Sequence, residues 1–424
     1  MSRLFILWVV LLTTVAWPQE SETNSPTLTL LQAAELTLAR NPRLRSASFG
    51  REAAAADLDQ AALKPQWSVD LQVEDFAGTG AVSGIESAET TLRLSRIFQS
   101  SGIRTGRMSV ASALEGQVEN DLDIKRLDLM TLLAHRFLVV VRQQELFDLA
   151  EHSVEVWKHA TQLAQTRERA GAAPAVERLR TEIRVANAGL QLEDAEHELQ
   201  AARVLLAATW GDSAPTFGTA DATLCSLTEL APFDVVAANL DRNPDLLRFA
   251  SEKRVQEAQA QLAIARQKPD WTLSAGVRRF ELLDDQALVF GVSVPLGSAS
   301  RAAPALRRAK ALSQQSDFEE QDARLGIRAT LYELYQELLH TRTEVELFEK
   351  EILPRADMIL NDIEDGYRVG RFSHLELVNA QAELLAARAA RLDACNNHHL
   401  YLIDIERLTG GGSIWLAPLT GVTP

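Results

Sequence analysis

The sequence is poor in cysteine and carries fewer basic than acidic residues. Only two of its 424 residues are cysteines, Cys225 and Cys395, which excludes a zinc ribbon, a CxxC redox site and a disulfide-dense scaffold. Lys and Arg number 43 against 58 Asp and Glu, so the net charge is -15. A protein that binds nucleic acid by neutralising phosphates needs the opposite sign. We therefore expect no nucleic-acid partner.

Catalytic and metal-binding motifs are also missing from the sequence. It contains no GxSxG motif, no P-loop and no GxGxxG segment after a predicted strand. His152 and His159 lie seven residues apart, too far to chelate one ion comfortably, and His398 and His399 are adjacent and point in different directions on a helix. We expect no enzyme activity, no cofactor and no metal site.

The first residues predict export from the cytoplasm. Arg3 precedes an apolar run from Leu4 to Ala16, and a polar stretch follows over 19–25. This is the pattern of a secretory signal peptide over residues 1–16, with a boundary that could extend to about residue 25. A run of this length is too short for a helix to cross a bilayer core, which needs about 20 apolar residues.

A tandem duplication organises the rest of the chain. Several landmarks recur in the same order at a spacing of about 200 residues, as in repeat proteins. They are Arg40-Asn41-Pro42 with Arg242-Asn243-Pro244, Lys64-Pro65-Gln66-Trp67 with Lys268-Pro269-Asp270-Trp271, and Ala170-Gly171 with Val369-Gly370. The sequence predicts a first repeat over 27–225, a second over 226–412, and a tail over 413–424.

Each repeat contains a predicted strand hairpin. From Trp67 to Glu74 apolar and polar residues alternate strictly, and they alternate again from Trp271 to Arg278. This period of two is typical of a strand with one apolar face. Residues 90–97 and 288–294 supply the partner strands. Trp67 and Trp271 are expected to anchor at a membrane interface, with core packing as the alternative.

The hairpins are embedded in long predicted helices. Residues 28–63 and 233–267 have apolar positions three and four apart and break at Asn-Pro. Residues 103–169 and 302–368 contain almost no glycine or proline, and 67 helical residues make a rod of about 100 Å. A second helix of about 40 residues must run back antiparallel after each Gly171 or Gly370 turn, because the connection is short.

Four strands with an apolar outer face are too few to close a barrel. The smallest barrels need eight strands, and open edges would promote aggregation. We therefore expect several copies to pool their strands into one barrel, which the long helices continue as a tube.

At this point the sequence resembles a known family, the TolC-like outer-membrane factors. The resemblance runs from about Thr27 to Gly410 and is most specific over Tyr367 to Gln381, which looks like the family's turn between its last two long helices. It implies an α+β membrane protein, a homotrimer with a twelve-stranded barrel in the outer membrane and a helical tunnel in the periplasm. The implied partners are outer-membrane lipid, a periplasmic adaptor protein and an inner-membrane pump of the resistance-nodulation-division type. The branch it resembles most serves heavy-metal efflux.

The resemblance also implies site residues. In the family, acidic side chains on the last helix close the periplasmic end, and the matching positions are Glu376 and Asn379. Asn379 departs from the acidic residue of some members. The expected periplasmic tip consists of Tyr367, Gly370, Arg371, Phe372, Gly171 and Glu177. Phe372 stands where the family has an arginine, with Arg371 adjacent.

Three alternatives stay open from the sequence. A periplasmic adaptor also has an export signal and long helical hairpins, although it places one hairpin centrally and is not duplicated in this way. A type I secretion duct shares the predicted fold, and a purely structural coiled coil predicts no alternating strands.

An exported chain permits a disulfide between Cys225 and Cys395, but only if their Cα atoms lie within about 7 Å.

Overall fold

The computed structural model describes residues 26–227 and 229–410. The predicted signal peptide and the predicted tail over 413–424 lie outside these residues. The division into repeats at 225 and 226 stays a prediction, although the order of elements is the same in both halves.

The first half contains four helices and a strand hairpin. Its principal elements are α1 (Leu30–Arg40), α2 (Pro42–Ala62), β1 (Trp67–Glu74), β2 (Glu89–Phe98), α3 (Ile103–Arg169) and α4 (Ala175–Ala207), with short 3₁₀ turns at Gly80–Val82 and Ala208–Trp210. The second half repeats this order. Its elements are α5 (Phe233–Ala237), a 3₁₀ turn (Ala238–Arg242), α6 (Pro244–Ala265), β3 (Trp271–Phe280), β4 (Asp285–Ser293), α7 (Ser298–Leu347), a π-helical turn (Phe348–Ile352), α8 (Leu353–Arg368) and α9 (His374–Leu408).

The two Asn-Pro landmarks start helices, as the sequence predicts. Asn41 caps α2 by accepting a hydrogen bond from the Arg43 amide at 2.7 Å, and Asn243 caps α6 through the Asp245 amide at 2.8 Å. Each proline follows directly, where its missing N–H costs nothing. The asparagine side chains also donate to the ends of the returning helical segments. Asn41 reaches the Thr209 carbonyl at 2.6 Å, and Asn243 reaches the Leu408 carbonyl at 3.0 Å.

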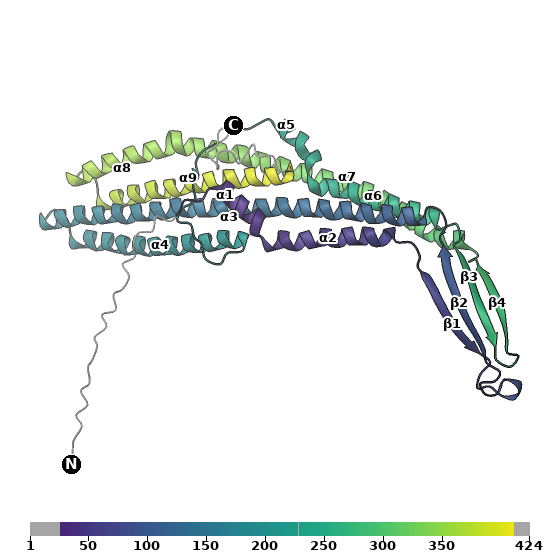
Figure 1. The fold of residues 1–424 in the computed structure, drawn as a ribbon. Coiled ribbons are helices and arrows are strands. Elements are labelled where there is room, and N and C mark those ends of the chain that lie inside the picture. The colour runs from purple at the N-terminus through teal and green to yellow at the C-terminus, as the bar shows by residue number, and fades with distance from the viewer. Residues whose placement is uncertain (1–25, 228, 411–424) are drawn as a thin grey trace, which may run out of the picture.

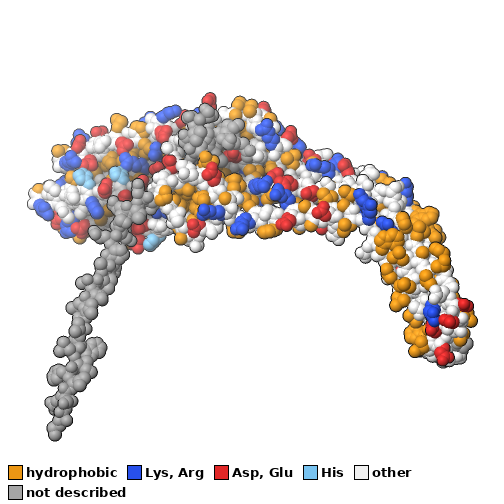
Figure 2. All heavy atoms as spheres, in the orientation of Figure 1, with side chains coloured by type: hydrophobic (Ala, Val, Ile, Leu, Met, Phe, Trp, Pro, Cys, Tyr) orange, Lys and Arg blue, Asp and Glu red, His pale blue; other side chains and the backbone are white. Residues whose placement is uncertain are grey.

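Both hairpins lie at one end of the molecule and join into a single antiparallel sheet (Figure 1). The strand order is β1-β2-β3-β4, so β1 and β4 are its two edges. One face carries large apolar side chains that are exposed, among them Val69, Leu71 and Phe290, and Figure 2 shows apolar atoms gathered on the sheet. Trp67 and Trp271 are about half exposed, at 56% and 52%, so they are not core residues in the single chain.

The opposite face of the sheet is polar. Ser68 and Ser95 share a hydrogen bond of 2.7 Å between their hydroxyls, and Arg278 pairs with Glu89 at 2.9 Å and Glu74 at 3.4 Å. The predicted alternation is therefore confirmed on both faces.

The predicted continuous helix over 302–368 differs from the structure in two respects. The segment starts earlier, at Ser298, and a π-helical turn at Phe348–Ile352 divides it into α7 and α8. Pro354 explains the position of this turn, because a proline nitrogen cannot donate the helical hydrogen bond to residue 350. The returning helices α4 and α9 have 33 and 35 residues, somewhat fewer than expected, because the turns and the final 3₁₀ segment use the remainder.

The main core lies midway along the helical body, where α1, α3, α4 and α9 meet around fully buried residues such as Phe137 and Leu206.

The structure joins Cys225 and Cys395 in a disulfide with a Cα–Cα distance of 5.0 Å. His399 contacts the Leu224 carbonyl at 2.8 Å beside it. These contacts fix the segment after α4 to α9.

Within residues 26–227 and 229–410, we find no helix with the length and apolar character that crossing a membrane requires.

Candidate functional site

Two turns, residues 170–174 and 369–373, lie at the end of the helical body far from the sheet, and we define the tip as these turns together with the helix ends that flank them (Figure 1). Gly171 and Gly370 each adopt a positive φ, 68° and 80°, which favours glycine at these turns. The structure therefore brings the predicted tip residues of the two repeats to the same end of the molecule.

Tyr367 connects the two repeats at the tip. Its ring is buried, with 1% exposure, and its hydroxyl donates a hydrogen bond to the Glu177 carboxylate at 2.9 Å. Burial, together with this bond to a negative group, raises the pKa of Tyr367 to about 12. The hydroxyl stays protonated at physiological pH, so it remains a donor.

Arg167 completes this contact, and the sequence did not reveal it. Its guanidinium donates to the Tyr367 carbonyl at 2.6 Å and lies 4.3 Å from the centre of the Tyr367 ring. The available signal was the pair of basic residues, Arg167 and Arg169, in the last turn of α3. Such residues commonly bind the terminal carbonyls of their own helix, but here Arg167 reaches the neighbouring repeat.

Phe372 and Arg371 pack together at the second turn. The Arg371 guanidinium lies 4.9 Å from the centre of the Phe372 ring. The ring lies against Gly366, where a Cβ atom would collide with it, so the glycine permits this close approach. Arg371 donates its backbone N–H to the Gly366 carbonyl at 2.7 Å. In this chain the predicted Phe372 position supports the turn by packing, while Arg167 supplies the cation beside Tyr367.

Glu376 forms the first turn of α9 together with Ser373. The Glu376 carboxylate accepts from the Ser373 amide at 2.7 Å, and the Ser373 hydroxyl accepts from the Glu376 amide at 3.3 Å, which makes a capping box. The hydrogen bond from the Ser373 amide lowers the pKa of Glu376. Glu376 and Asn379 are both exposed, one helical turn apart. Their place at a constriction between copies stays a prediction.

His374 is a second tip residue that the sequence did not indicate. Its ring is 6% exposed and its centre lies 6.0 Å from that of Tyr367. Neither ring nitrogen has a hydrogen-bond partner among the described residues. Burial lowers the pKa of His374, which keeps the ring neutral at physiological pH.

Three further histidines make packing or surface contacts. His159 on α3 contacts Glu364 on α8 at 3.1 Å, and His398 and His399 are buried against each other with ring centres 5.7 Å apart. Over 26–227 and 229–410, no group of three or more His, Cys, Asp or Glu residues is placed to hold a metal ion.

A buried carboxyl group lies far from the tip, near the middle of the body. Glu406 on α9 is 8% exposed and lines a cavity of about 560 Å³ together with Leu30, Met130 and Leu247. Burial raises its pKa to about 7. No predicted site residue lines this cavity.

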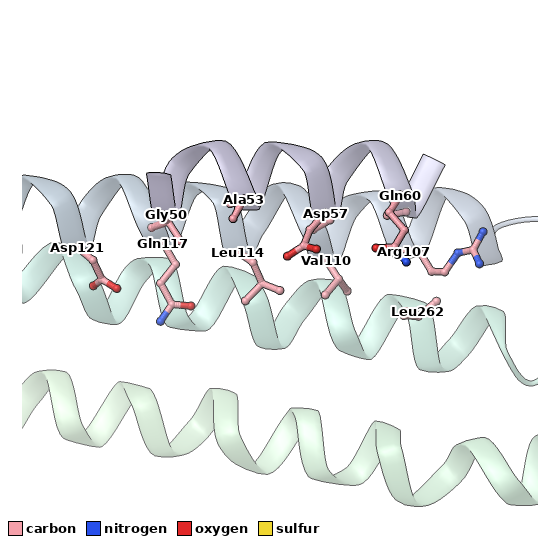
Figure 3. A pocket seen from close by; sticks show the side chains of 14 residues that line it. Gly50, Ala53, Asp57, Gln60, Arg107, Val110, Leu114, Gln117, Asp121 and Leu262 are labelled. Carbon is pink, nitrogen blue, oxygen red and sulfur yellow. The ribbon is translucent and has the colours of Figure 1, made fainter. Parts of the chain in front are cut away.

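A shallow groove of about 650 Å³ runs between α2 and α3, near the sheet (Figure 3). Small residues of α2, including Gly50 and Ala53, form one side, and Val110 and Leu114 of α3 form the other. Its charged lining residues are Asp57, Asp121 and Arg107. It lies about 75 to 95 Å from the tip at 1.5 Å per residue along α3, so it is separate from the predicted site.

Comparisons with known proteins agree with this architecture. The family model of the outer membrane efflux protein matches residues 33–212 and 235–411. The cobalt-zinc-cadmium resistance protein CzcC of Cupriavidus metallidurans is 27% identical over 385 residues, covering 90% of each chain.

Solved structures have the same fold. The crystal structure of CusC matches with a TM-score of 0.76 at 15% identity, covering 91% of this chain and 92% of that chain. The CmeC outer membrane channel of Campylobacter jejuni matches with a TM-score of 0.71 at 15% identity, covering 94% and 91%.

Proposed function

The chain belongs to the outer membrane efflux protein family, and from this premise we propose that three copies form one duct whose tip is the gate and whose cargo is metal cations. Family membership makes the chain an outer membrane efflux channel of a tripartite pump, with its helical part in the periplasm, and not an enzyme. The adaptor alternative is thereby wrong.

The open sheet is the observation that carries the proposed assembly. The four-stranded sheet leaves β1 and β4 as edges and exposes an apolar face at the end of a body about 100 Å long. Two copies would supply eight strands, whose barrel is just wide enough for its own side chains, whereas three supply twelve and leave an open channel. Channels of this family form trimers in tripartite pumps, which supports three. The polar face with Arg278 and Glu89 would then line the lumen.

The proposed gate consists of the tip residues and the start of α9. Tyr367, Glu177 and Arg167 hold the two turns together within one copy. Glu376 and Asn379 are exposed, and among residues 26–227 and 229–410 their side chains have no hydrogen-bond partner apart from the Ser373 cap. Three copies around one axis would bring three Glu376 carboxylates near each other. Such a ring attracts cations and disfavours anions.

Metal cations are the cargo that one relative, CzcC, supports. CzcC is a cobalt-zinc-cadmium resistance protein, and it matches over 90% of this chain. The proposed partners are a periplasmic adaptor and an inner-membrane pump of the resistance-nodulation-division type, because a passive duct needs a separate driving force. The net charge of -15 is compatible with a lumen that admits cations.

Membrane fractionation followed by mass measurement in detergent tests the assembly. We expect the mature chain in the outer membrane as a trimer, and a soluble monomer would contradict the proposal.

The cargo is tested in a host that lacks its own metal efflux duct. Supplying this chain with its pump and adaptor should restore growth at raised zinc, cobalt or cadmium. Restored growth against apolar drugs alone would exclude metal cargo.

A further inference from the structure

The cavity in the middle of the helical body is used by neither the proposed barrel nor the proposed gate. Its volume is about 560 Å³, within the range of small-molecule binding sites, about 300 to 1,000 Å³. Helices α1, α3, α6 and α9 of one chain contribute its walls. Its apolar lining residues include Leu30, Ala34, Leu127, Met130, Leu133 and Ile403. A lining of this kind suits the apolar part of a ligand.

Glu406 is the only buried ionisable residue among the described residues that line this cavity. Its exposure is 8%, and no hydrogen bond or ion pair joins its carboxyl group to another residue of 26–227 or 229–410. A buried carboxyl group without a partner is unfavourable, and buried polar groups in folded proteins are nearly always hydrogen-bonded. The missing partner therefore points to a ligand.

The other charged residues at the cavity are paired or exposed. They are Asp123, Arg126, Arg242 and Arg407. Asp123 and Arg126 pair with each other at 2.9 Å, and Arg407 pairs with two aspartates at 2.7 Å each. Arg242 is exposed, so water and salt screen its charge. Glu406 therefore dominates the electrostatic character of the buried part of the cavity.

From this arrangement we propose that the cavity binds an amphipathic amine, a small organic cation with one ammonium group and an apolar body. The ammonium group donates hydrogen bonds to the Glu406 carboxylate, and the apolar body packs against Leu30 and Met130. Hydrogen bonds between charged groups are about twice as strong as neutral ones. A metal ion fits poorly, because no group of three or more ligating side chains is present within 26–227 and 229–410. One chain supplies these groups, so the inference does not depend on the proposed trimer.

Binding of the ammonium group is coupled to the ionisation of Glu406. The carboxyl group must be ionised to pair with the cation, so a protonated Glu406 first releases its proton to water. Burial raises the pKa of Glu406 to about 7, and its ionised fraction therefore falls roughly tenfold from pH 8 to pH 6. An aliphatic amine stays protonated over this range. We expect the affinity for the amine to fall by the same factor.

Three matched probes test the site in the full mature chain held in lipid nanodiscs, with empty nanodiscs as the blank. They are phenylbutylamine, phenylbutanol and phenylbutyrate, which share one apolar body and carry a positive, no and a negative charge. Titration calorimetry at pH 8 should give an affinity for the amine at least roughly tenfold above that for the other two. Equal affinity for amine and alcohol, a preference for the acid, or no binding of the amine would each overturn the proposal.

Two variants test the residue and the cavity. Glu406→Gln retains the shape of the side chain and removes its charge, so the affinity for the amine should fall at least roughly tenfold and lose its pH dependence. Its affinity for the alcohol should not change. Glu383→Gln, which alters an exposed carboxylate on the same helix, is the control and should bind as the wild type does. Ala34→Phe fills the cavity and should abolish binding of the amine.

An affinity for the amine equal to that of the wild type in Glu406→Gln, or in a folded Ala34→Phe, overturns the proposal. If Ala34→Phe does not fold, Glu406→Gln and the pH dependence decide the outcome without it.

Discussion

The hydroxyl of Tyr367 donates a 2.9 Å hydrogen bond to Glu177, a residue 190 positions earlier in the sequence. This bond joins the turn of the second repeat to the first turn of α4 in the first repeat. Because the tip has no sheet and little core, single contacts of this kind decide how firmly its two helix pairs are held together.

Replacing Tyr367 with Phe should loosen the tip. The ring remains buried, so the loss is that of one hydrogen bond to a charged group, about 1.5 to 3 kcal/mol. We expect a larger single-channel conductance in planar bilayers with trimer formation unchanged. Tyr332→Phe is the matched control, since Tyr332 is exposed and no hydrogen bond joins its hydroxyl to a described residue. Equal conductance in wild type and Tyr367→Phe would show that the bond does not restrain the gate.

Replacing Glu376 with Gln separates charge from capping. Glutamine also completes a capping box, so folding should be retained while the proposed ring of carboxylates is lost. We expect weaker cation selectivity and weaker block by divalent ions in reconstituted channels. Glu383→Gln on the same helix serves as the control. Unchanged selectivity and block would place Glu376 on an outer surface.

We also expect the cation selectivity to depend on pH through the Glu376 carboxylate. The bond from the Ser373 amide lowers the pKa of Glu376 below its ordinary value of 4.5. Because the pKa is lowered, the charged cap stabilises the fold at pH values above the pKa of the unfolded state. This stabilisation is lost as pH falls through the pKa of the folded state. Cation selectivity should therefore persist to below pH 4.5. Selectivity that disappears between pH 6 and 5 would contradict an isolated, capped carboxylate and indicate strong repulsion within the ring.

Glu406 should make stability fall as pH rises. Its pKa is about 7 in the fold against 4.5 ordinarily, so between these values the folded state binds more protons than the unfolded state. The protein loses up to about 3 kcal/mol per chain across this window. Glu406→Gln should remove the slope in thermal unfolding from pH 4.5 to 8 in detergent, whereas Glu383→Gln should keep it. A slope that survives in Glu406→Gln would assign it to other groups.

Reduction of the disulfide should weaken the middle of the body and leave the sheet intact. The bond spans 170 residues, a loop whose closure is worth up to about 5 kcal/mol. The variant with Cys225→Ser and Cys395→Ala should melt several degrees lower and still assemble. Dithiothreitol should lower the melting temperature of the wild type but not of this variant. A wild type that melts at the same temperature with and without reductant, although its thiols are shown to be free, would contradict a stabilising role.

Local patterns in the sequence predicted most of the architecture. The period of two from Trp67 to Glu74 marks β1 at the residues where it forms, because sheet faces alternate strictly. The bounds of α3, Ile103–Arg169, agree with the predicted helix because no residue inside it breaks the hydrogen-bond ladder. The π-helical turn at Phe348–Ile352 was missed, although Pro354 marks the place. A proline predicts a disturbed turn, but not how the chain absorbs it.

The contacts at the tip could not be found in the same way. Arg167 lies beside Tyr367 only because the helix pairs of the two repeats meet at the tip, whereas His374 lies beside Tyr367 across the turn of its own repeat. Nothing in the sequence near Arg167 differs from any helix end with basic residues. The meeting of Cys225 and Cys395 likewise depends on a loop that returns to α9. Such contacts follow from tertiary packing, which local periodicity does not encode.

The side chains of Asn41 and Asn243 link the helices that lead to the sheet with the segments that return from the tip. Each amide holds the start of a helix that leads to the sheet and, at the same time, the end of a segment that returns from the tip. A movement of α4 or α9 at the tip is therefore resisted by the hydrogen bonds of Asn41 and Asn243 before it reaches the strands. In the proposed duct, this link would hold the strands in place while the helix ends at the proposed gate move.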